Sequence, residues 1–105
     1  MSFQQIDIAS ARQLLKEEAV TVLDIRDAGS FSAGHIESAI HAEAVDIDAF
    51  VADEDKNKPL LVYCYHGISS RGAAEYFTEN GFARVYSLDG GYVAWSESQG
   101  TPNAP

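Results

Sequence analysis

The amino-acid sequence predicts an α/β fold, in which a central parallel sheet of about five short strands carries helices on both faces. Short apolar runs alternate along the chain with segments of helical period, and this alternation implies a parallel sheet that is covered on both sides. Two of the runs, residues 20–23 and 60–63, have the composition of buried strands. At 105 residues, 46% of them hydrophobic, the chain can form one domain with its own core.

The first part of the chain predicts a strand, a helix and a second strand. Residues 3–6 are expected to form a short edge strand. Residues 8–16 are expected to form a helix, because their apolar side chains recur every three or four positions and Asp7 can cap the first turn. Residues 20–23 contain two valines and a threonine, and these β-branched residues favour a strand.

The middle of the chain predicts shorter elements. Residues 27–33 indicate one or two helical turns, and residues 39–41 indicate a brief strand. The apolar residues after Asp46 have helical spacing, so a short helix is expected there. Residues 60–63 follow a proline and form the second clear buried strand.

The last third of the chain predicts a helix, a strand and a final helix. Residues 70–80 have helical character, and the Asn-Gly pair at their end is a C-terminal stop signal. Residues 84–86 are expected to form a short strand and residues 89–99 the last helix. Residues 1–105 then make a single domain, of which residues 100–105 are a flexible tail.

The charge of the chain narrows the classes of partner. Sixteen acidic residues face seven basic ones, for a formal net charge of -9. Nucleic acids and anionic membranes are bound through lysine and arginine, so we expect neither as a partner. No apolar run approaches the roughly 18 residues that a membrane span requires, and no N-terminal targeting segment is evident.

The cysteine and histidine content points to a cytoplasmic protein without a metal. The single cysteine excludes an intramolecular disulfide, and a lone thiol suits a reducing compartment. The three histidines and the cysteine have no metal-ligand spacing, so we predict no metal.

The loop that begins at Cys64 is the strongest candidate for a functional site. Cys64 directly follows the predicted strand 60–63, and ligands of parallel sheets bind at the carboxyl ends of strands. A short loop between a strand and a helix can turn its N–H groups inward as an anion-binding nest. The helix start adds about half a positive charge, and this environment lowers the pKa of a thiol.

The other residues of the loop fit this interpretation. Gly67 permits the backbone conformations of a tight cradle, Ser69 can offer its hydroxyl to the sulfur, and His66 and Arg71 are nearby candidate cations. Free cysteines are more often buried and inert. The position of Cys64 before a turn that contains glycine and serine nevertheless favours a reactive thiolate.

Four short motifs follow one another along the chain: the Asp-x-Arg segment 22–27 with Phe31, the Gly-His-Ile segment 34–39, the loop 64–69, and residues 88–91 with Trp95. In this order they resemble the motifs of the single-domain rhodaneses. The loop itself is closest to that of the bacterial thiosulfate sulfurtransferases in this family. The resemblance runs from about Ile6 to Trp95 and implies a rhodanese-like domain.

The resemblance implies a double-displacement transfer of sulfur. The Cys64 thiolate attacks the outer sulfur of thiosulfate, sulfite leaves, and a persulfide remains on Cys64. A thiophilic acceptor, which is cyanide or a dithiol such as thioredoxin, then takes the sulfur. No cofactor is implied beyond this covalent intermediate. The N–H groups expected to hold the persulfide belong to the loop residues Tyr65, His66, Gly67, Ile68, Ser69 and Ser70.

Two other functions remain to be weighed against the sulfurtransferase. Some rhodanese-like domains are non-catalytic binding or regulatory modules that have lost the cysteine, and the presence of Cys64 argues against that function. A carrier module that delivers sulfur to a protein partner such as thioredoxin remains an alternative. Phosphatases of the Cdc25 type have a similar fold and need an arginine that follows the cysteine after five intervening residues, so that it can bind phosphate. That position is Ser70 in this chain, and Arg71 comes one residue too late.

Residues outside the loop are expected to support the site. Asp24 and Arg26 are expected to form a structural ion pair that braces the loop, in preference to a direct catalytic role. His35 is expected to be a hydrogen-bonded turn residue, and His41 to lie at a strand end or on the surface. The protein is expected to be a monomer or a weak homodimer.

Two loop positions depart from the usual pattern of the family. Tyr65 and His66 stand where larger family members place basic residues, so most of the binding of thiosulfate is expected to come from the backbone N–H groups of the loop. Ile68 stands where an asparagine is more usual, and an apolar side chain there favours a protein or hydrophobic acceptor.

Overall fold

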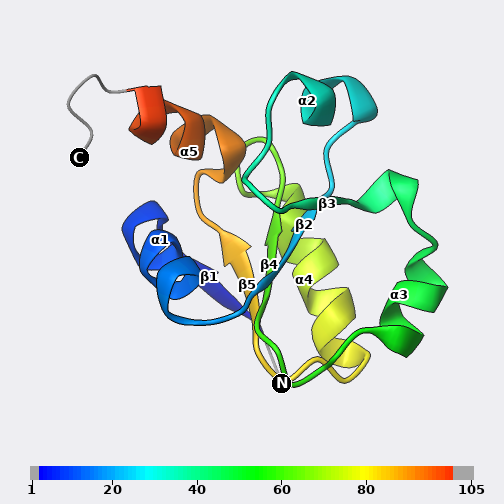
Figure 1. The fold of residues 1–105 in the computed structure, drawn as a ribbon. Helices are drawn as coiled ribbons and strands as arrows, with labels where there is room; N and C mark the ends of the chain where they lie inside the picture. The colour runs from blue at the N-terminus through cyan, green and yellow to red at the C-terminus, as the bar shows by residue number, and fades with distance from the viewer. Residues whose placement is uncertain (1–2, 101–105) are drawn as a thin grey trace.

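The computed structural model describes residues 3–100 and contains the predicted parallel sheet. Five strands lie in the order β1-β5-β4-β2-β3, and every neighbouring pair is parallel (Figure 1). The strands are β1 (Gln4–Ile6), β2 (Thr21–Asp24), β3 (Ile40–His41), β4 (Leu60–Tyr63) and β5 (Val85–Leu88).

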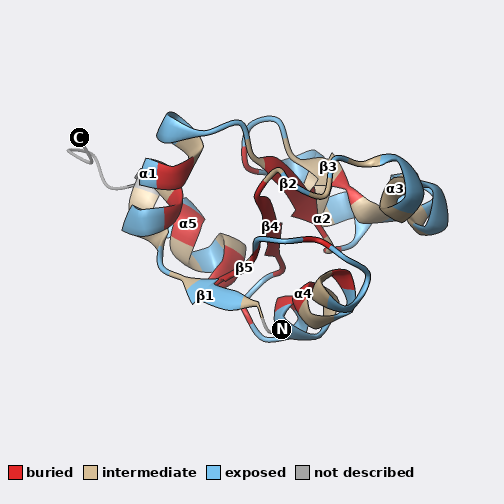
Figure 2. Ribbon diagram, turned by 90° about the horizontal axis from the view of Figure 1, so that it is seen from below, coloured by how far each residue is buried: buried red, intermediate tan, exposed pale blue. Residues whose placement is uncertain are grey.

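Helices pack on both faces of the sheet, as the alternating pattern predicts. Helices α1 and α5 lie together on one face and α3 and α4 on the other (Figure 2). The short helix α2 projects beyond the carboxyl end of β2 (Figure 1). The helices are α1 (Ile8–Glu17), α2 (Ala28–Ala33), α3 (Ile47–Asp53), α4 (Ser69–Glu79) and α5 (Gly91–Gly100), with a 3₁₀ turn at Ala42–Ala44.

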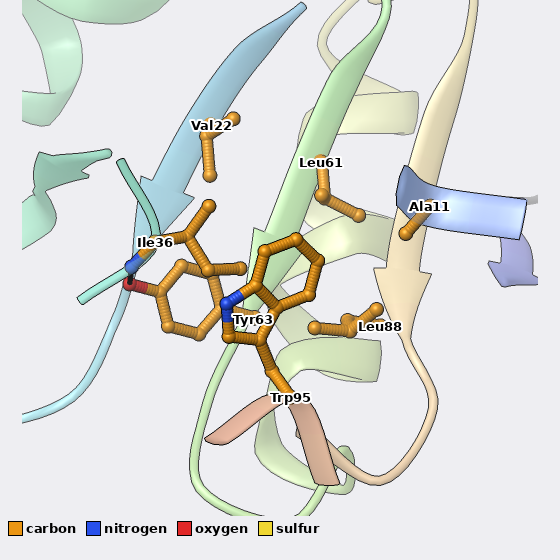
Figure 3. Packing of buried hydrophobic residues seen from close by; sticks show 7 residues of the cluster. All are labelled: Ala11, Val22, Ile36, Leu61, Tyr63, Leu88 and Trp95. Carbon is orange, nitrogen blue, oxygen red and sulfur yellow. Dashed lines mark hydrogen bonds between the residues drawn. The ribbon is translucent and has the colours of Figure 1, made fainter. Parts of the chain in front are cut away.

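Strand β4 forms the centre of the core because both of its faces are buried. Leu61 and Tyr63 face α1 and α5, where Trp95 packs against them (Figure 3). Leu60 and Val62 face the opposite side, toward α3 and α4. Full burial of such side chains stabilises the fold by about 1.5–3 kcal/mol each. This packing fixes the position of the carboxyl end of β4.

Aspartates cap three of the helices. The carboxylate of Asp7 accepts a hydrogen bond from the N–H of Ser10 at 2.8 Å, which is the cap predicted for α1. Asp27 caps α2 and Asp46 caps α3 in the same way. Each cap satisfies N–H groups that the helix itself leaves unpaired, and loss of such a cap costs about 1 kcal/mol.

The structure differs from the sequence prediction at the end of β5. The strand was expected over residues 84–86 but extends to Leu88, because Ile6 of β1 pairs with Leu88 in register. Helix α5 begins at Gly91 and not at residue 89, since Gly90 and Gly91 both have positive φ and form the turn between strand and helix.

Smaller differences concern helix ends and short turns. Helix α4 begins at Ser69, one residue before the predicted start. The 3₁₀ turn at Ala42–Ala44 was not predicted, since three residues carry too little periodicity to be recognised. Helix α5 runs to Gly100, and the remainder of the predicted tail, residues 101–105, lies outside the described residues. None of the helices within residues 3–100 has the length and apolar character to cross a membrane.

Candidate active site

Cys64 lies where two strand ends meet at one edge of the sheet. It follows Tyr63, the last residue of β4, and Tyr63 pairs in register with Asp24, the last residue of β2. The Cys64 side chain is 5% exposed. The parallel pairing of β2 and β4 therefore places the two sequence segments that were singled out, the Cys64 loop and the Asp24-x-Arg26 segment, next to each other.

The sulfur of Cys64 is surrounded by hydrogen-bond donors of its own loop. The N–H groups of Gly67 and Ser70 each lie 3.2 Å from Sγ. The Ser70 hydroxyl oxygen is 3.4 Å from Sγ, and Ser70 is fully buried. When Cys64 carries its proton, the thiol can donate to this hydroxyl; when Cys64 is ionised, the hydroxyl donates to the sulfur. The hydroxyl contact expected from Ser69 is made by Ser70 in the structure.

These contacts set the pKa of the Cys64 thiol. Burial by itself raises that pKa, because it penalises the charged form. Hydrogen bonds from the Ser70 hydroxyl and from the N–H groups of Ser70, Gly67 and His66 outweigh burial. The pKa of Cys64 consequently lies below that of an ordinary thiol, and the thiolate is favoured.

The N-terminus of α5 orients the loop from behind. The N–H of Tyr92 donates to the carbonyl of Cys64 at 2.8 Å, and the N–H of Val93 donates to the carbonyl of Tyr65 at 3.0 Å. These carbonyls are thus occupied on the α5 side, while the later N–H groups of the loop face the sulfur. Gly91 makes this approach possible, because a Cβ there would lie 2.4 Å from the carbonyl oxygen of Tyr65 and 2.6 Å from that of Cys64.

Gly67 has the conformational role that the sequence analysis expected. Its φ is +89°, a region that residues with a side chain rarely adopt. A Cβ at Gly67 would also lie 2.8 Å from the carbonyl oxygen of Leu88 and 2.8 Å from the nitrogen of Gly90. The loop therefore reverses direction against the end of β5, and this turn aims the Gly67 N–H at the sulfur.

An open depression of about 310 Å³ gives access to the cysteine. His66 and Ser69 are exposed at this depression, and Ile68 is 68% exposed. A small anion can enter from solvent and meet both the sulfur and the exposed side chains of the loop. The residues that line the depression are Cys64, Tyr65, His66, Ile68 and Ser69.

Asp24 and Arg26 form the expected ion pair. The Arg26 guanidinium binds both carboxylate oxygens of Asp24, with the shortest distance 2.7 Å, and also donates to the carbonyl of Gly34 at 2.7 Å. Both side chains are buried. Burial acts to raise the pKa of Asp24, but its hydrogen bonds, chiefly from Arg26, leave that pKa below its usual value. The guanidinium stacks 4.2 Å from the ring centre of Tyr92 and so ties β2 to α5.

Tyr65 connects the loop to α2. Its hydroxyl donates to the carboxylate of Asp27, the cap of α2, and also contacts the hydroxyl of Ser30. The bond to Tyr65, followed by the bonds to Ser30, holds the pKa of Asp27 well below its usual range. The first side chain after Cys64 is thus bound to the α2 segment and does not extend freely into solvent.

The remaining predicted residues lie around this centre. His35 is exposed, its Nδ1 lies 2.8 Å from the carbonyl of Phe31, and its ring stacks on the Phe31 ring. This is the turn role expected for His35. His41 is at a strand end but is buried, with Nε2 2.7 Å from the carbonyl of Arg26. Arg71 is exposed in the first turn of α4.

Two residues of the site were not singled out by the sequence analysis. Ser87 of β5 is fully buried, and its hydroxyl oxygen lies 2.7 Å from that of Ser70. The available signal was a serine inside an otherwise apolar strand, since a buried hydroxyl needs a partner. Gly91 was interpreted only as part of a tight turn, because its contact with the loop joins positions far apart in sequence.

Comparison with known proteins gives consistent matches over nearly the whole chain. A family model described as a rhodanese-like domain matches residues 7–98. The thiosulfate sulfurtransferase GlpE of Shewanella oneidensis is 43% identical over 97 residues, which are 92% of this chain and 96% of the relative. The thiosulfate sulfurtransferase GlpE of Pseudoalteromonas translucida is 44% identical over 95 residues, which are 90% of each chain.

Solved structures agree at the level of the fold. The crystal structure of a rhodanese-related protein from Thermoplasma volcanium superposes with a TM-score of 0.71 at 28% identity. The match covers 95% of this chain and 96% of that protein. The similarity of the fold therefore extends over nearly the whole chain.

Proposed function

The chain belongs to the rhodanese-like domain family, and on this basis we propose that it is a thiosulfate sulfurtransferase with Cys64 as its nucleophile. Two curated relatives named as thiosulfate sulfurtransferases are 43% and 44% identical to it over at least 90% of its length. The observation that carries the proposal is the set of hydrogen bonds directed at the Cys64 sulfur. These bonds favour the thiolate, which is the form that attacks sulfur.

The first half of the reaction loads the enzyme. The Cys64 thiolate attacks the outer sulfur of thiosulfate, a new S–S bond forms, and the S–S bond of thiosulfate breaks. Sulfite leaves with the electron pair of that bond, and a persulfide remains on Cys64. No general base is needed once the thiol is ionised, and the hydrogen bonds that lower the pKa of Cys64 favour that form. We propose no cofactor beyond this persulfide.

The second half of the reaction returns the enzyme to the thiolate. A thiophilic acceptor attacks the outer sulfur of the persulfide, and Cys64 leaves as thiolate. With cyanide the product is thiocyanate. With a dithiol, the acceptor first carries the persulfide; its second thiol then forms a disulfide and releases hydrosulfide. We propose cyanide and dithiols, including thioredoxin, as acceptors, and the exposed Ile68 at the rim supports an acceptor with an apolar surface.

The N–H groups of the loop have the same role in both halves. Those of residues 65–70 would hold the negative charge of the thiolate and of the persulfide at a preorganised site. Ionised thiolate and persulfide are both anions, so one cradle serves the resting and the loaded enzyme. We propose a structural role for the buried Asp24–Arg26 pair, because the Arg26 guanidinium lies 5.7 Å from the ring centre of Tyr65 in the loop and 4.2 Å from that of Tyr92 in α5.

The same loop argues against phosphatase activity. A phosphate group is gripped by an arginine that donates two parallel hydrogen bonds. The residue at that position is Ser70, which is fully buried and contacts the sulfur. Arg71 follows it in α4, and its side chain is exposed. The cradle therefore fits a sulfur anion and lacks the guanidinium that phosphate transfer requires.

A mass measurement tests the central step. Incubation with thiosulfate should add one sulfur atom, about 32 Da, to the intact protein, and a dithiol should remove it. A Cys64→Ser variant should gain no mass and show no turnover. Sulfur uptake by that variant would refute the assignment of the nucleophile, and absence of uptake by the natural protein would refute the function.

Steady-state kinetics test the order of the steps. Initial rates measured at several thiosulfate and cyanide concentrations should give parallel double-reciprocal lines, as ping-pong transfer requires. Intersecting lines would indicate a ternary complex and contradict a persulfide that exists without bound acceptor. Repeating the assay with reduced thioredoxin ranks the two acceptors.

Two further properties are proposed with the function. The reaction requires Cys64 as a free thiolate, and a reducing compartment preserves it, so we propose the cytoplasm as the location. We propose that the protein is a monomer or a weak homodimer, which sedimentation at several protein concentrations would test.

A further inference from the structure

Ser87 is a buried polar residue that the mechanism above does not use. It lies in β5, is fully buried, and pairs in register with Val62 of β4. Val62 and the neighbouring Val85 belong to the core that packs against α4. The Ser87 hydroxyl therefore sits in apolar surroundings, where an unpaired hydroxyl would cost about 1–3 kcal/mol.

The partner of this hydroxyl is the same Ser70 that contacts the reactive sulfur. The two hydroxyl oxygens are 2.7 Å apart, a distance typical of an O–H···O hydrogen bond. The Ser70 oxygen is in turn 3.4 Å from Sγ of Cys64. Three elements thus contribute one side chain each to a chain of contacts that runs from β5 through α4 to the cysteine.

The number of available protons determines the direction of the hydrogen bonds between Ser87, Ser70 and Cys64. A hydroxyl has one proton to donate, so Ser70 can donate either to Ser87 or to the Cys64 sulfur. A thiolate accepts only. If Ser87 donates to Ser70, the proton of Ser70 is free to point at the sulfur; if Ser70 donates to Ser87, the thiolate loses that bond.

We propose that Ser87 is a positioning residue: by donating to Ser70, it directs the Ser70 hydroxyl toward Cys64 and favours the thiolate. Ser87 does not touch the sulfur and acts only through Ser70. The proposal deepens the sulfurtransferase function and rests on that function only for its catalytic consequence. The effect on the thiolate itself is a property of the resting protein.

Other charged or titratable groups near Cys64 lie on the surrounding segments. His66 and Tyr65 belong to the loop, Arg71 to the first turn of α4, and Asp89 follows β5 before α5 begins. These groups are unchanged when Ser87 is substituted. A change in the titration of Cys64 on substitution of Ser87 can therefore be assigned to the hydrogen bonds that link Ser87, Ser70 and Cys64.

The test is the pH dependence of Cys64 alkylation by iodoacetamide. Cys64 is the only cysteine of the chain, so the reaction reports on this thiol alone. Removal of the hydroxyl in Ser87→Ala should raise the apparent pKa and slow alkylation at pH 7 by about threefold to tenfold. Ser96→Ala is the matched control, since it removes an exposed hydroxyl from α5 outside the loop, and it should behave like the natural protein.

A second pair of variants separates the hydroxyl from the packing. Threonine and valine at position 87 have the same shape and differ in the hydroxyl alone. Ser87→Thr should keep the natural pH profile and Ser87→Val should shift it as Ser87→Ala does. Equal profiles for the threonine and valine variants would overturn the proposal, and this comparison stands whatever the stability of Ser87→Ala.

A double substitution tests whether Ser87 acts through Ser70. In a Ser70→Ala background, Ser87→Ala should cause no further shift, because the intermediate hydroxyl is already absent. A further shift of the original size would overturn the proposed route. All these measurements are made without thiosulfate, so a failure of the sulfurtransferase assay and a failure of this proposal are distinguishable.

Discussion

At the scale of the residue, the reactivity of Cys64 depends on groups that are small and uncharged. Backbone N–H groups and one serine hydroxyl surround the sulfur, although the chain as a whole carries a net charge of -9. Fixed dipoles at about 3.2 Å act strongly in a buried site, where water does not screen them. The acidic character of the protein is therefore compatible with an anionic nucleophile.

The buried pair of Asp24 and Arg26 provides a prediction at this scale. The substitution Asp24→Asn should lower the free energy of unfolding by about 3–5 kcal/mol at pH 7, because it leaves the Arg26 charge buried without its partner. Both side chains are at most 5% exposed. Urea unfolding measures this loss. Asp53→Asn, the same substitution at an exposed position, should change the stability little.

The pH dependence of that difference follows from the sign of the pKa shift. Folding lowers the pKa of Asp24, so the pair stabilises the fold fully above the unfolded pKa of about 3.9 and progressively less as the pH falls toward the folded pKa. The difference between the natural protein and Asp24→Asn should be constant from about pH 5 to pH 8 and shrink below about pH 4. A difference that grew on acidification would contradict the assignment.

At the scale of the element, the site is assembled from loop backbone and a helix terminus. The two N–H groups at the start of α5 bind the carbonyls of Cys64 and Tyr65, and these bonds hold the loop in the orientation that the sulfur needs. The sequence does not predict this contact, because the Gly90-Gly91 pair is a common turn signal and does not indicate that the turn packs against the Cys64 loop. The strands and helices themselves follow from local periodicity, and nearly all were predicted.

Two glycines offer a prediction at the scale of the element. Gly91→Ala should lower both stability and activity, because its Cβ would lie 2.4–2.6 Å from loop carbonyl oxygens and its φ is +60°. Gly72→Ala is the control: apart from its neighbours and the nearby backbone of its own helix, no atom lies within 4 Å of the new Cβ, and alanine in a helix should stabilise the fold by about 0.5–1 kcal/mol. Thermal unfolding and sulfur-transfer rates measure both effects. Retention of full activity by Gly91→Ala would contradict the role given to α5.

At the scale of the whole molecule, a single sheet with helices on both faces brings three separate segments to one edge. The strands that end at Asp24, Tyr63 and Leu88 are parallel, so the loops that follow them converge. The radius of gyration is 13.0 Å, which is comparable to the Debye length of about 10 Å at 0.1 M salt. At low ionic strength the sixteen acidic groups therefore repel one another across the entire protein.

Ionic strength gives the prediction at the scale of the whole molecule. The Tm should rise by a few degrees between about 0.01 M and 0.15 M sodium chloride, because salt screens this repulsion. Surface ion pairs such as Glu18–Arg84 weaken under the same conditions, but exposed pairs contribute little. Differential scanning calorimetry at constant pH measures the shift. A fall in Tm would show that attractive pairs outweigh the net charge.

The sequence by itself determined the fold class, the order of the elements and the identity of Cys64 as the candidate nucleophile. Each of these follows from local information: hydrophobic period, turn residues, and a cysteine between a strand and a helix. Only the tertiary structure decided which hydroxyl meets the sulfur, and that Ser87 and Gly91 belong to the site. These contacts join residues far apart in the chain, and their distances depend on how β5 and α5 pack against the loop, which no local pattern encodes.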